Sequence, residues 1–230
     1  MDIQLPKLVD NEYLSSIFPY IWLSSPCFFL GCLVVRAIEG KRQAFNFDEF
    51  KSTVFGSILL GILFSSRQIM QLFLDDSKTT MEPLEIVLKL IFAVSFMDFI
   101  FYWIHRSLHE VQSLRKYHAV HHRLRANHTV WGGLDENWQE TIVIFMYLNA
   151  PFLFISVTKE FYLMYLIAGS FQTALMHGTS ISFPPRPLVN ATFHHTHHKY
   201  LTKNYAGAIM LWDYLFGTMK LEGSKVKQDE

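Results

Sequence analysis

Long apolar segments, separated by short charged stretches, dominate the pattern of the chain. Two shorter segments, 141–157 and 161–176, are joined by the turn Thr158–Lys159–Glu160 and are typical of a helical hairpin. Three others approach the roughly 20 residues that an α-helix needs to cross a bilayer core, and they cover residues 17–35, 53–74 and 84–104. The pattern therefore predicts an all-α integral membrane protein with three N-terminal transmembrane helices and a membrane hairpin.

The sequence predicts one structural domain. The sequence has no Gly/Ser linker and no internal repeat that would divide it. Within that domain we expect N-terminal membrane helices over residues 1–83, a catalytic region over 84–220 and a polar C-terminal tail over 221–230. Basic side chains follow the first, third and fifth apolar segments, so the positive-inside rule predicts that the stretches after segments three and five face the cytoplasm.

Composition limits the classes of function. Hydrophobic residues make up 50% of the chain and charged residues only 17%, against about 25% charged residues in a typical soluble domain. This deficit favours lipid as the solvent for much of the surface. The 20 basic and 20 acidic side chains balance, which gives no support to a nucleic-acid partner. Cys27 and Cys32 lie in one apolar run, and they indicate neither a disulfide framework nor a thiolate metal site.

The eleven histidines occur in two regions only, residues 105–128 and 177–198. A single pair spaced i, i+4 would be typical of a capping or surface feature. Here one such pair, two groups spaced i, i+3, i+4 and a histidine at the end of the fifth apolar segment fall on the same predicted side of the membrane. Clustered imidazoles would repel one another if protonated, and a metal ion keeps them neutral. The sequence therefore predicts a metal site formed by His105, His109, His118, His121, His122, His177, His194, His197 and His198.

The number of histidines predicts two metal ions. Imidazole suits zinc, copper, iron and nickel, but a single zinc ion takes four ligands, far fewer than nine. Two ions, each with four or five imidazoles and an open position for oxygen, would use the whole set. Ligand number does not by itself select iron over zinc; a pair of iron ions is favoured because the neighbouring membrane supplies C–H bonds to oxidise. We expect these histidines to lie on a cytoplasmic helical cap.

The sequence around these histidines resembles the fatty acid hydroxylase/sterol desaturase superfamily of membrane-bound di-iron oxygenases. The resemblance covers about residues 90–220, and it rests on the stretch 98–122 and on the groups His194–His198, Asn204–Tyr205, Trp212–Asp213 and Phe216–Gly217–Thr218. It implies that the nine histidines bind two iron ions and that the protein uses dioxygen to hydroxylate or desaturate a lipid. It also implies the endoplasmic reticulum membrane as location and electrons from NAD(P)H through cytochrome b5 or a similar donor.

Four further residues are candidates for contacts near the metal ligands. Asp98 lies two helical turns before His105, where it could orient a ligand imidazole or pair with Lys89 or Arg67. The sterol oxidase branch of the family often has a His-Pro pair shortly before a glutamate, where this chain has Asn137, a candidate for a weak or water-mediated ligand. Thr173 stands where acyl hydroxylases have an additional histidine, so the resemblance is nearer to the sterol oxidase branch and favours a sterol-like substrate. The candidates are Asp98, Asn137, Thr173 and His195, with His128 also outside the ligand pattern.

Other functions remain open. Within the same superfamily the alternative is a fatty acid or sphingolipid hydroxylase. From other classes, a histidine-rich membrane metal transporter and an inactive scaffold both fit a histidine cluster. Transporter sites lie near the bilayer midplane on broken helices, whereas these histidines lie in Arg/Lys-rich stretches. An inactive scaffold is disfavoured because all nine predicted ligand positions are filled.

Overall fold

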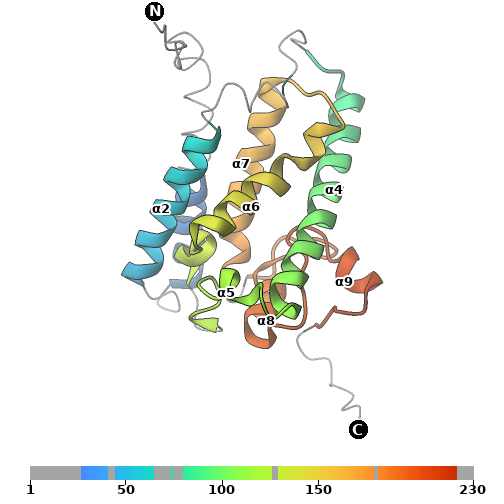
Figure 1. Cartoon of the computed structure of the whole chain (residues 1–230). Coiled ribbons are helices and arrows are strands. Elements are labelled where there is room, and N and C mark those ends of the chain that lie inside the picture. Colours follow the sequence, from blue (N-terminus) through green and yellow to red (C-terminus); the bar gives the residue numbers. More distant parts are fainter. Residues whose placement is uncertain are drawn as a thin grey trace, which may run out of the picture.

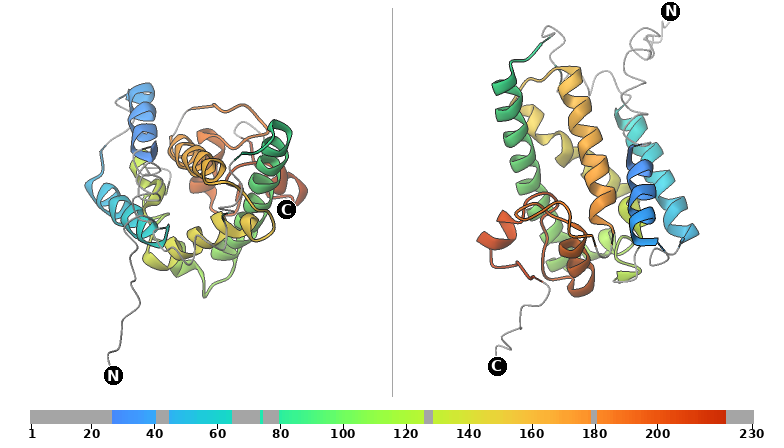
Figure 2. Two further views of the ribbon diagram at one scale, coloured as in Figure 1. Left: turned by 90° about the horizontal axis from the view of Figure 1, so that it is seen from above. Right: turned by 180° about the vertical axis from the view of Figure 1, so that it is seen from behind.

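The computed structural model describes residues 27–40, 45–64, 74, 80–125, 129–178 and 181–221, and these residues are mainly helical (Figure 1). A helix over residues 27–39 comes first and lies beside α2 in both views of Figure 2. The elements that follow are α2 (Phe47–Phe64), α4 (Pro83–Glu110), α5 (Arg115–His118), η3 (Val130–Leu134), α6 (Trp138–Asn149), η4 (Ala150–Leu153), α7 (Lys159–Met176), α8 (Ala191–Tyr200) and α9 (Leu211–Leu215).

The long helices form a bundle, and the short helices gather at one end of it. In Figure 1, α6 crosses between α2 and α4, α7 lies behind it, and α5, α8 and α9 lie at the lower end. Local signals set where the helices begin. Pro83 occupies the first turn of α4, where its missing N–H costs no hydrogen bond. The side chains of Asn137, Thr158 and Asn190 accept hydrogen bonds from backbone N–H groups at the starts of α6, α7 and α8.

The prediction of three transmembrane helices and a membrane hairpin is wrong. Among the residues that the structure describes, no helix combines the length and the apolar character needed to cross a membrane. The hairpin consists of α6 and α7, with 12 and 18 residues, shorter than the roughly 20 needed. The long helix α4 has Lys89 and Asp98 within its apolar stretch. Segments 17–35 and 53–74 lie partly outside the described residues.

Three groups of buried side chains hold the elements together. One surrounds Phe152 and Tyr162 between η4 and α7. A second packs Phe28, at the start of the first helix, against Trp131 of η3. A third joins Tyr102 of α4 to residues of α8 and of the loop that follows it. Because α2 contacts η3 and α6, the described residues of this N-terminal helix pack against the segment that carries the histidines.

Candidate metal centre

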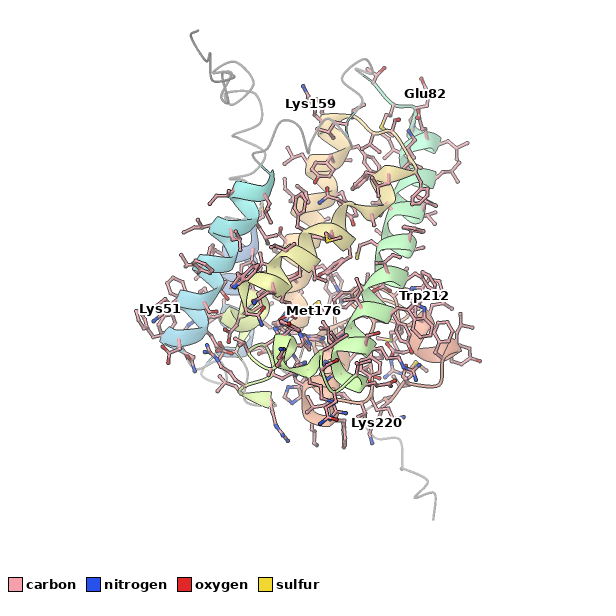
Figure 3. The ribbon with its side chains drawn as sticks, in the orientation of Figure 1. Lys51, Glu82, Lys159, Met176, Trp212 and Lys220 are labelled. Carbon is pink, nitrogen blue, oxygen red and sulfur yellow. The ribbon has the colours of Figure 1, made fainter. Side chains whose placement is uncertain are left out.

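The nine predicted histidines meet at the end of the bundle where α5 and α8 lie. They form two groups, and within each group the nitrogen atoms that could bind a metal all lie within 4.8 Å of one another. The five-histidine group contains His105, His109, His118, His122 and His197. The four-histidine group contains His121, His177, His194 and His198. Figure 3 labels Met176, the residue before His177, near this end of the bundle, whereas Glu82 and Lys159 lie at the other end.

Both HxxHH motifs contribute to both groups. On α8, His197 belongs to the five-histidine group, whereas His194 and His198 belong to the four-histidine group. In the first motif, His118 ends the short helix α5, and a turn carries His121 and His122 to different groups. The His105–His109 pair, one turn apart on α4, stays together.

Backbone carbonyls determine how several imidazoles are oriented. His105 Nδ1 lies 2.7 Å from the carbonyl oxygen of Tyr205, and His197 Nδ1 lies 2.7 Å from that of Lys203. His177 Nδ1 makes the same contact with the Thr173 carbonyl, also at 2.7 Å. A carbonyl oxygen only accepts, so each Nδ1 must carry the hydrogen, and each Nε2 is left with a lone pair. This is the orientation in which Nε2 can bind a metal.

The arrangement of the imidazoles fits a bound cation. The Nε2 atoms of His105 and His197 have lone pairs, because their Nδ1 atoms face carbonyl oxygens. Both imidazoles belong to the group of five whose nitrogen atoms all lie within 4.8 Å of one another. In the same group, His109 Nε2 is buried with no hydrogen-bond partner among the described residues. A metal ion bound by these lone pairs would also give the His109 nitrogen a partner.

Burial keeps these imidazoles uncharged. Desolvation lowers the pKa of His118 to about 3 and that of His177 to about 4. It also lowers the pKa values of His105, His122 and His197 well below the usual 6.5. Neutral imidazole is the form that binds a metal ion.

Asp98 does not orient an imidazole, and it does not pair with Lys89. It is fully buried, and its two oxygens accept hydrogen bonds from the backbone N–H groups of Gly207, Ala208 and Ile209 at 2.8, 2.8 and 2.9 Å. Burial raises the pKa of Asp98 to about 7, although the three N–H donors oppose this shift. Lys89 instead pairs with Glu85 on the same helix, and Arg67 lies outside the described residues.

The remaining candidates for contacts near the metal ligands lie in different places. The Asn137 side chain accepts from Glu140 N and donates to the Tyr117 carbonyl, so it caps α6. Thr173 lies on a cavity wall, and its carbonyl is the partner of His177 Nδ1. His195 lies on α8 outside both histidine groups. His128 lies outside the described residues.

Sequence patterns alone did not reveal two kinds of contact. Glu140 contacts the imidazole of His118. The available signal was its position in the first turn of α6, three residues after a capping asparagine and just before an apolar run. The Tyr205 and Lys203 carbonyls carry no sequence signal, because every residue has a carbonyl.

An apolar cavity of about 450 Å³ opens onto both histidine groups. Imidazoles of both groups lie on its wall, among them His105 and His118 from the first group and His121 and His177 from the second. The remaining wall comes mainly from apolar side chains of α4, α6 and α7, such as Met97, Phe101, Val143, Leu166 and Met176. This volume falls in the range of about 300–1,000 Å³ found for small-molecule sites.

Comparison with known proteins identifies the family of the chain. Residues 90–218, more than half of the chain, match the fatty acid hydroxylase family. The chain belongs to the fatty acid hydroxylase family. The predicted family is thereby confirmed, and the matched stretch contains all nine histidines.

Several curated proteins are similar to this member of the family. The Delta(7)-sterol 5(6)-desaturase of Aspergillus fumigatus is 31% identical over 147 residues, which cover 60% of this chain and 41% of the relative. Human lathosterol oxidase is 30% identical over 147 residues, 59% of this chain and 46% of the relative. Human alkylglycerol monooxygenase is 29% identical over 140 residues, 56% of this chain and 30% of the relative. The chain thus spans less than half the length of these relatives, and no solved structure matches it.

Proposed function

We propose that this protein is a di-iron oxidoreductase that hydroxylates or desaturates a lipid with dioxygen, and that the lipid is sterol-like. The observation that carries the proposal is the pair of histidine groups facing one apolar cavity. In this proposal the five-histidine group binds one iron ion and the four-histidine group binds the other. Bound iron would supply the activation of dioxygen that an unreactive C–H bond requires.

The chain itself binds the substrate and orients the ligands. The apolar cavity walls bind the lipid and exclude water from the reacting carbon. The carbonyls of Thr173, Lys203 and Tyr205 hold three imidazoles with Nε2 toward the metals. An apolar wall suits a lipid and is a poor path for a hydrated ion, which argues against a metal transporter.

The resemblance also supports the electron source and the location. We include NAD(P)H as the source of electrons, cytochrome b5 or a similar membrane protein as the donor, and the cytoplasmic side of the endoplasmic reticulum membrane as the place of reaction. The preference for a sterol over a free or sphingoid acyl chain has two supports. Thr173, with no imidazole, stands on the cavity wall, and two of the similar proteins are a sterol desaturase and lathosterol oxidase.

A reconstituted assay tests the proposal. The iron-loaded protein, supplied with NADPH, cytochrome b5 and its reductase, is offered a sterol panel and a ceramide panel, with products analysed by mass spectrometry. We expect a sterol product that has either gained an oxygen atom or lost two hydrogen atoms. Human lathosterol oxidase in the same mixture shows that the electron donors work. Product from ceramides alone would overturn the sterol preference, and iron-loaded protein without product in either panel would overturn the oxidoreductase proposal.

A further inference from the structure

The imidazole of His118 has a side-chain carboxyl group as its partner. The Nδ1 atoms of His105, His177 and His197 face neutral backbone carbonyls. His118 Nδ1 instead contacts a carboxylate oxygen of Glu140, and both side chains are about 7% exposed. The other carboxylate oxygen, Glu140 Oε2, is buried with no hydrogen-bond partner among the described residues.

The first turn of α6 is built to hold this carboxylate in place. Asn137 accepts a hydrogen bond from Glu140 N at 3.0 Å, and its Nδ2 donates to the carbonyl of Tyr117, the residue before His118. One side chain therefore ties the start of α6 to α5. A carboxylate in the first turn is also stabilised by the helix dipole. This connection holds the backbone of Glu140 near His118.

A carboxylate acts on a ligand imidazole in two ways. It accepts the Nδ1 hydrogen, which fixes the tautomer and the ring plane, and its negative charge makes Nε2 a stronger electron donor to a metal. His118 Nε2 lies 3.0 Å from His105 Nε2 and 2.9 Å from His122 Nε2. The effect of Glu140 is therefore directed into the five-histidine group.

We propose that Glu140 is a positioning residue that holds His118 for metal binding and strengthens binding of the ion at the five-histidine group. This inference rests on the proposed function, because it takes the two histidine groups to be metal sites. It assigns to Glu140 no contact with the substrate.

The chain contains a matched control in Glu136. This residue lies four positions before Glu140, just ahead of α6, is 5% exposed and, like Glu140, lines the apolar cavity. Its Oε1 accepts a hydrogen bond from the Thr141 hydroxyl at 3.0 Å, not from an imidazole. Glu136→Gln therefore removes an equally buried carboxylate that lacks the contact with a ligand.

The test is an anaerobic titration of the full-length, metal-free protein with Fe²⁺ in competition with a chromogenic chelator. Glu140→Gln keeps an oxygen that can accept the Nδ1 hydrogen but removes the charge. We expect it to weaken the binding of one of the two ions by about 10- to 100-fold and to leave the affinity for the other ion unchanged. Glu136→Gln should bind both ions as the wild-type protein does, and Mössbauer spectra should show a change at one iron of Glu140→Gln only.

The outcomes separate the two proposals. Wild-type protein that does not take up two ions would refute the proposed function, and this inference with it. Two ions in the wild-type protein, with Glu140→Gln binding both equally well, would refute the role of Glu140 alone. An equal loss in Glu136→Gln would also refute it, since any buried carboxylate would then have the same effect. Glu140→Asp retains the charge and should recover part of the affinity; if it binds as weakly as Glu140→Gln, the charge is not the cause.

Discussion

Replacing His197 with alanine should remove the ion from the five-histidine group and lower lipid oxidation at least about 100-fold. His197 is fully buried, and its Nε2 lies 3.1 Å from His122 Nε2. The loss of activity should exceed the roughly 10- to 100-fold effect of replacing a residue that only hydrogen-bonds to a metal ligand, because this substitution removes the ligand itself. His121→Ala should remove the ion from the four-histidine group with a similar loss of turnover, because neither ion alone completes the centre.

Iron content per chain, Mössbauer spectra and turnover of each variant check this result. The protein should be loaded with Fe²⁺ after purification, because zinc from the expression host can fill such sites. His195→Ala provides the control on α8, since His195 lies outside both groups. It should keep both ions and most of the activity. An intact pair of irons in His197→Ala or His121→Ala would show that the assignment of ligands is wrong.

Asp98→Ala should cause the largest loss of stability among substitutions away from the histidines. The carboxylate is the acceptor for three buried N–H groups of residues 207–209, and alanine would leave all three without it. Leaving one buried polar group unsatisfied costs about 1–3 kcal/mol, so we expect a loss of about 3 kcal/mol or more. The same loop contains Tyr205, whose carbonyl faces His105 Nδ1, so iron affinity should fall as well.

Thermal and urea unfolding of the metal-free variants measure the effect of Asp98. Asp98→Asn retains one acceptor oxygen and should be intermediate between wild type and Asp98→Ala. Glu85→Ala is the control on the same helix, because it removes only a partly exposed i, i+4 pair with Lys89, worth less than about 1 kcal/mol. If Asp98→Ala and Glu85→Ala unfold at the same urea concentration, Asp98 does not anchor the loop.

The predicted transmembrane helices illustrate where apolar patterning misleads. A run of apolar residues does not show where a helix ends. The run 84–104 predicts a helix, but in the structure α4 continues past this run to Glu110. The buried Asp98 lies within that stretch, where it binds the 207–209 loop. An apolar run that contains such an anchor faces other parts of the protein along that side.

The sequence by itself determined the residues of the histidine cluster and the family. Spacings of three and four residues place imidazoles on one face of a helix, and this depends only on local backbone geometry. The structure brings together the eight histidines that these spacings selected, and His177 at the end of α7 joins them. The capping residues Thr158 and Asn190 are local signals of the same kind.

Only the tertiary structure decided how these histidines are divided and what orients them. His197 and His198 are adjacent in sequence but belong to different groups, because the assignment depends on which neighbouring helices each imidazole meets. The partner of His118 comes from a residue 22 positions away, and that of His105 from one 100 positions away. Contacts at such separations follow from how α4, α5, α6 and the loop after α8 pack together, and helical periodicity carries no information about them.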